Sequence, residues 1–74
     1  MTPERANALE EAVREGMRVA NELSDAAATL RREVARGVAV HCTLDAKAAR
    51  ADALQVASDE IRAALSGVAE RECA

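Results

Sequence analysis

The 74-residue chain has no phenylalanine, tyrosine or tryptophan, three glycines and a single proline. Without large rings it cannot fill a wide core, and it has few of the turn residues that a β-rich fold needs. Half of its residues are nevertheless apolar, and 19 of them are alanine. Because alanine has the best helix propensity and lets helices approach closely, the composition predicts an all-α fold.

The chain also lacks a basic excess, a leader-like start and a long apolar run. Its net charge of −3 argues against a broad nucleic-acid surface, which is normally basic. Residues 1–16 lack the basic segment and the run of about 7–15 apolar residues of a secretory signal. No window approaches the roughly 20 apolar residues of a membrane span. Two cysteines in so short a chain favour free thiols, and we expect a cytoplasmic protein with no membrane partner.

Two helices are expected, over residues 3–36 and 44–72, joined by a bend at 37–43. The first begins at Thr2, Pro3 and Glu4, which supply a capping hydroxyl, a preset first turn and an acid at the helix N-terminus. It ends at Gly37, while the second begins after Thr43 or Asp45. Small or apolar residues recur at spacings of three and four. They are Ala6, Leu9, Val13, Gly16, Ala20, Leu23, Ala27, Leu30 and Val34, then Ala51, Leu54, Ser58, Ile61, Leu65 and Val68.

A short connection between two long helices predicts one domain, 1–74, that folds as an antiparallel, coiled-coil-like hairpin. The register follows from matching small residues to large ones, because interdigitated sizes fill space without voids. A turn centred between Val40 and His41 sets Gly16 against Leu65 and Leu23 against Ser58. A shift of one heptad would instead place Gly16 against Ser58, and we reject it.

A lone hairpin of this size is marginally stable, so we expect two copies to pair into a homodimeric four-helix bundle. Residues 31–50 carry five basic and two acidic side chains, net +3, whereas residues 1–25 and 51–74 are each −3. An antiparallel dimer would place each basic bend beside the acidic end of its partner. The predicted interface consists of residues that a hairpin leaves exposed. They are Ala12, Met17, Val19 and Ala26 on the first helix, and Ala57 and Ala64 on the second.

His41 and Cys42 are adjacent in the bend and could be a metal site or a nucleophile with its base. A structural zinc site needs four ligands, but the chain offers one histidine and two cysteines, with Cys73 near the far end of the second helix. Neighbouring side chains also rarely place a nucleophile and its base correctly. We therefore expect no metal, no cofactor, no small-molecule substrate and no enzymatic activity.

The main surface feature is a basic cluster around the bend. Arginine forks bind carboxylates and phosphates, so the cluster could contact an acidic protein or a nucleic acid, or could simply be a solvated helix end. The negative net charge and the absence of stacking rings favour protein. We expect a regulator of a larger protein: an adaptor, a chaperone-like subunit or an inhibitor of the kind that phages and mobile elements encode. The alternative is a nucleic-acid-binding regulator. The predicted contact residues are Arg31, Arg32, Arg36, Lys47 and Arg50.

Overall fold

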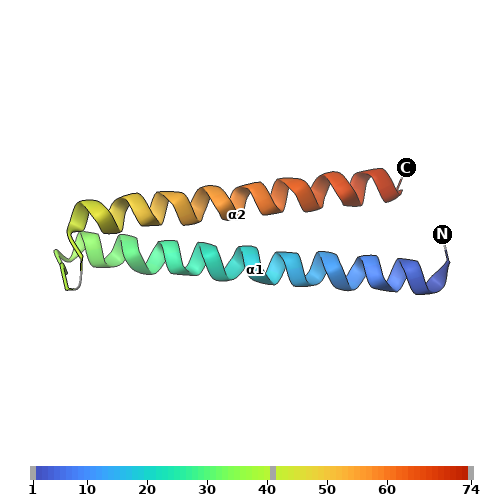
Figure 1. The fold of residues 1–74 in the computed structure, drawn as a ribbon, viewed down its shortest axis with the longest axis horizontal. Helices are drawn as coiled ribbons and strands as arrows, with labels where there is room; N and C mark the ends of the chain where they lie inside the picture. Colours follow the sequence, from blue (N-terminus) through green and yellow to red (C-terminus); the bar gives the residue numbers. More distant parts are fainter. Residues whose placement is uncertain (1, 41, 74) are drawn as a thin grey trace.

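The computed structural model describes residues 2–40 and 42–73, which form an antiparallel hairpin of two helices (Figure 1). Helix α1 is Pro3–Ala35 and helix α2 is Leu44–Cys73. The hairpin measures 52 × 17 × 14 Å, with the bend at one end and the first turn of α1 beside the last turn of α2 at the other. The all-α hairpin is therefore confirmed, with α1 one residue shorter and α2 one residue longer than predicted. Within the described residues, neither helix is long and apolar enough to cross a membrane.

Each helix begins at a threonine cap. Thr2 has extended backbone (φ −72°, ψ 154°), and its Oγ1 accepts a hydrogen bond from the Arg5 amide at 3.2 Å. The Thr43 hydroxyl oxygen accepts from the Ala46 amide at 3.1 Å. The sequence allowed two caps for α2, and the structure uses Thr43. Helix α2 begins directly after Thr43, whereas Asp45 already lies in its first turn.

Helix α1 ends in a Schellman motif. Gly37 has φ +70°, a left-handed conformation that glycine adopts without steric cost. Its amide donates to the Val34 carbonyl at 3.1 Å, and the Val38 amide donates to the Glu33 carbonyl at 2.9 Å. These two bonds satisfy carbonyls that the helix end would otherwise leave open, and they turn the chain toward α2.

The interface between the helices is built from small side chains. Ala20, Ala27 and Ala51 are fully buried, and Ser58 is the largest fully buried side chain among the described residues. The large apolar residues of the predicted stripes are only half-buried, among them Leu9, Leu23, Leu30, Leu54, Ile61 and Leu65. Alanines on the seam let the backbones approach closely, and the leucines flank this line of contact instead of filling a core.

The register agrees with the prediction. A Cβ added to Gly16 would lie 2.8 Å from Leu65 Cδ1, so the glycine gives room to that leucine. The buried Ser58 hydroxyl donates to the Ala20 carbonyl at 2.8 Å, a bond between the helices. Because Gly16 meets Leu65 and not Ser58, the register shifted by one heptad is excluded.

Candidate functional site

One face of the hairpin is closed by polar bonds between the helices, and we call it the bridged face. The guanidinium of Arg31 donates to Gln55 Oε1 at 3.2 Å and pairs with Asp52 Oδ1 at 3.4 Å. Farther from the bend, Arg62 Nη2 donates to Asn21 Oδ1 at 2.9 Å. Arg31 was predicted to contact a partner. In the structure its guanidinium joins α1 to α2 through Gln55 and Asp52.

The opposite face is apolar. Each residue turns the helix by about 100°, so side chains on either flank of the buried seam fall on opposite faces. By this geometry Leu23 and Leu30 of α1, with Leu54 and Ile61 of α2, lie on the flank away from the bridged face, and all four are half-buried. The outer edges of this face carry five of the six predicted dimer residues. We define the apolar face by the four large residues and by Ala12, Val19, Ala26, Ala57 and Ala64.

Met17, the sixth predicted dimer residue, lies apart from Val19 on helix α1. Residues two positions apart in a helix are rotated by about 200° relative to each other, so the side chains of Met17 and Val19 emerge on opposite flanks of the seam. Met17, which is 36% exposed, belongs to the bridged face.

Lys47 was expected on the basic surface and is instead buried, with 5% of its side chain exposed. Its ammonium donates to the Val38 carbonyl at 2.7 Å and pairs with Glu33 Oε2 at 3.1 Å. It therefore joins the first turns of α2 to the last turn of α1 and to the bend.

The remaining basic residues are exposed on the helix turns that flank the bend. Arg32, Arg36 and Arg50 are exposed and make no ion pair among the described residues, although Arg32 donates to the Thr29 hydroxyl oxygen at 3.1 Å. Val38 and Val40 lie between the helices at the tip and are 36% and 59% exposed. We call these five residues (Arg32, Arg36, Val38, Val40 and Arg50) the basic bend.

The His41–Cys42 pair can be described only in part, because His41 lies outside the described residues. Cys42 is a half-buried free thiol. The 30 residues of α2 span about 45 Å, which separates Cys42 from Cys73 far beyond the roughly 5.5 Å between the Cα atoms of a disulfide. The two cysteines of one hairpin therefore cannot bond to each other.

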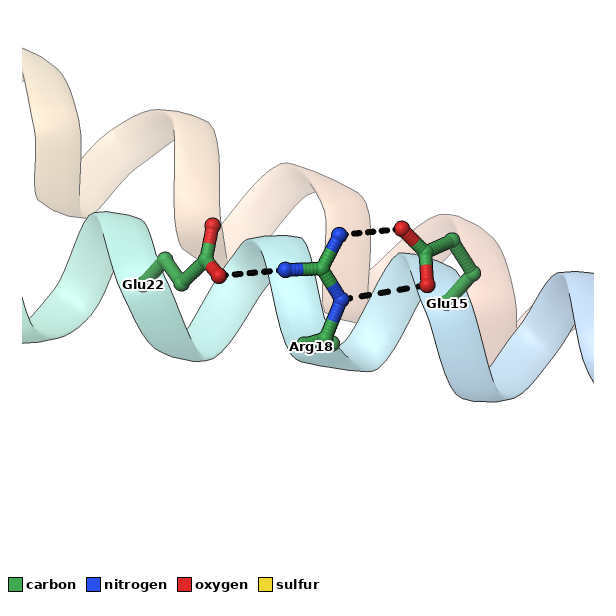
Figure 2. Close-up of polar contacts among 3 residues, drawn as sticks. All are labelled: Glu15, Arg18 and Glu22. Atoms are coloured by element: carbon green, nitrogen blue, oxygen red, sulfur yellow. Dashed lines mark hydrogen bonds and ion pairs between the residues drawn. The ribbon is translucent and has the colours of Figure 1, made fainter.

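A second charged cluster lies on the outer surface of α1. Arg18 binds both Glu15, three residues before it, and Glu22, four residues after it (Figure 2). The hydrogen bonds from Arg18, and then its charge, lower the pKa of the Glu15 carboxyl, and the two carboxylates raise the pKa of Arg18. All three side chains are more than half exposed. Each ionic group of this cluster has a partner on the same helix, and the cluster keeps a net charge of −1.

Comparison with protein families, curated proteins and solved structures finds no match to this chain.

Proposed function

We propose that this chain is a small, non-enzymatic, homodimeric regulator that binds a larger protein through the basic bend. The observation that carries the proposal is the set of arginines there that have no carboxylate partner in the described structure. Arg36 and Arg50 are exposed on the turns that flank the bend, and Val38 and Val40 are exposed within it, so this end of the hairpin has both charge and apolar surface. Arginine is one of the residue types enriched at protein-binding hot spots.

The chemistry of the tip favours an acidic protein surface as the partner. The guanidinium fork pairs with carboxylates through two parallel hydrogen bonds. The rest of the chain is acidic, which weakens nucleic-acid binding, and no aromatic side chain is present to stack on bases. Binding there would place the rod-shaped hairpin against the partner end-on, as expected of an adaptor, a chaperone-like subunit or an inhibitor.

The test begins with capture of the partner from the source cells and its identification by mass spectrometry. Binding of the purified partner is then compared between Arg36→Gln/Arg50→Gln and Arg5→Gln/Arg71→Gln. The second pair removes the same charge from exposed arginines at the open end of the hairpin. We expect the bend variant to bind at least about tenfold more weakly, since a hot-spot arginine is worth more than 1 kcal/mol, and the control to bind normally.

Two outcomes would overturn the proposal. Equal affinity in both variants would show that the bend does not contact the partner. Tight, steeply salt-dependent binding of the unmodified chain to generic duplex DNA or single-stranded RNA would instead establish the nucleic-acid regulator.

A further inference from the structure

The hairpin leaves its large apolar side chains without full cover. Only Ala20, Ala27 and Ala51 are buried apolar residues among those described, whereas Leu23 and Ile61 stay half-buried. A chain of this length buries too little surface to be robust alone. Met17 on the bridged face and Val56 are also 36% and 54% exposed, but the four large half-buried residues of the apolar face lie together on one flank of the seam.

The hairpin is large enough for a protein–protein interface along one side. Its 52 × 17 Å outline sets an upper limit on the order of 800 Å² per copy on what one face can bury, which is the size of a standard stable interface. Its edges carry alanine and valine, so a second pair of helices can approach without steric obstruction. A four-helix bundle is the common arrangement for two such hairpins.

We infer that the apolar face packs against the same face of a second copy in antiparallel orientation. Charge determines the orientation. Residues 31–50 at the bend are net +3, whereas residues 1–25 and 51–74, which form most of the rest of the rod, are each −3. Parallel pairing would place two basic bends side by side and two acidic ends side by side, whereas antiparallel pairing places each bend beside an acidic end. A twofold axis across the middle of the rod generates this arrangement.

This orientation gives the dimer two identical basic bends at opposite ends of one rod. They are about 50 Å apart, the length of a 33-residue helix. If the bend binds a partner as proposed above, the dimer is bivalent and joins two partner molecules at a fixed distance. The bivalency rests on the proposed function, while the dimer and its orientation do not.

The face is tested with two neighbouring alanines of α2. Ala64 lies on the apolar face, whereas Ala63 points away from the seam, and both are exposed in the hairpin. Neither substitution to glutamate disturbs the contacts between α1 and α2, so a lone hairpin would tolerate both equally. We expect Ala64→Glu to raise the dimer dissociation constant at least tenfold in sedimentation equilibrium and Ala63→Glu to leave it unchanged. Equal effects of the two variants would overturn the assignment of the face.

The orientation is tested through the native thiol of the bend. With Cys73 replaced by serine, a nitroxide label on Cys42 reports the distance between the two bends by double electron–electron resonance. The antiparallel dimer gives a distance of about 50 Å, from the rise of 1.5 Å per helical residue. A short distance, with the labels side by side, would establish the parallel dimer and exclude the bivalent rod. Because neither experiment uses a partner protein, failure here is distinct from failure of the proposed function.

Discussion

Gly16 tests the contact between the helices most sharply, because two opposing effects meet at it. Alanine is about 1 kcal/mol better than glycine inside a helix. At Gly16, however, the added Cβ would lie 2.8 Å from Leu65 Cδ1 and 3.1 Å from Cδ2. Overpacking of this kind costs about 1–3 kcal/mol, reduced where the neighbouring side chain can move. We therefore expect Gly16→Ala to change the free energy of unfolding by between zero and about 2 kcal/mol, in the destabilising direction.

Gly67 is the matched control. A Cβ added there meets no heavy atom within 4 Å, so Gly67→Ala gains the helix propensity alone. We expect stabilisation of about 0.5–1 kcal/mol, below the full value because the position is close to the end of α2. In a Leu65→Ala background the obstruction is gone, and Gly16→Ala becomes stabilising as well. The coupling between positions 16 and 65 then amounts to about 1 kcal/mol or more.

The assay is urea unfolding followed by far-ultraviolet circular dichroism, since the chain has no aromatic residue to give a fluorescence signal. All variants are measured at one protein concentration, because the stability of a dimer depends on concentration. Stabilisation of the unmodified background by Gly16→Ala as large as that by Gly67→Ala would show that Gly16 does not face Leu65. The packing argument and its register would then be refuted.

Three further predictions concern the bend and the surface of α1. Lys47→Met keeps most of the apolar stem but removes the ammonium that binds the Val38 carbonyl and the Glu33 carboxylate. We expect the free energy of unfolding, measured by urea unfolding, to fall by about 2 kcal/mol. An unchanged free energy would mean that the buried ammonium does not hold the bend. Gly37→Ala should cost about 1–2 kcal/mol in the same assay because its φ is +70°, and an unchanged midpoint would contradict the left-handed cap. The lowered pKa of Glu15 means that its stabilising contribution is present at neutral pH and is lost as the pH falls through that value. Carboxyl titration by nuclear magnetic resonance should therefore show this pKa rising in Arg18→Gln, and identical titration curves would count against the ion pair.

The sequence predicted the helices and their register because both depend on local or periodic information. The threonine caps and Gly37 act within a few residues, so the helix ends agree to within one position. Gly16 could be matched to Leu65 because small residues alternate with large ones along both stripes. The hydroxyl bond from Ser58 to Ala20 was not predicted, since it depends on how closely the two backbones approach.

The basic surface was harder to predict. Lys47 lies seven residues before Leu54, so extending the heptad stripe of α2 backward would have placed it on the seam. The charge of Lys47 favoured a surface position instead, because a lysine is rarely buried without a partner. Its partners, the Glu33 carboxylate and the Val38 carbonyl, come close only once the bend has formed. The engagement of Arg31 with Asp52 and Gln55 is likewise a contact between distant segments.

Sedimentation equilibrium of the unmodified chain at tens of micromolar shows whether the hairpin completes its core by pairing with a second copy. We expect a folded species of twice the chain mass of 7.8 kDa. A fully helical species at the mass of one chain would contradict this dimer, because the hairpin would then be folded with its apolar face exposed to water.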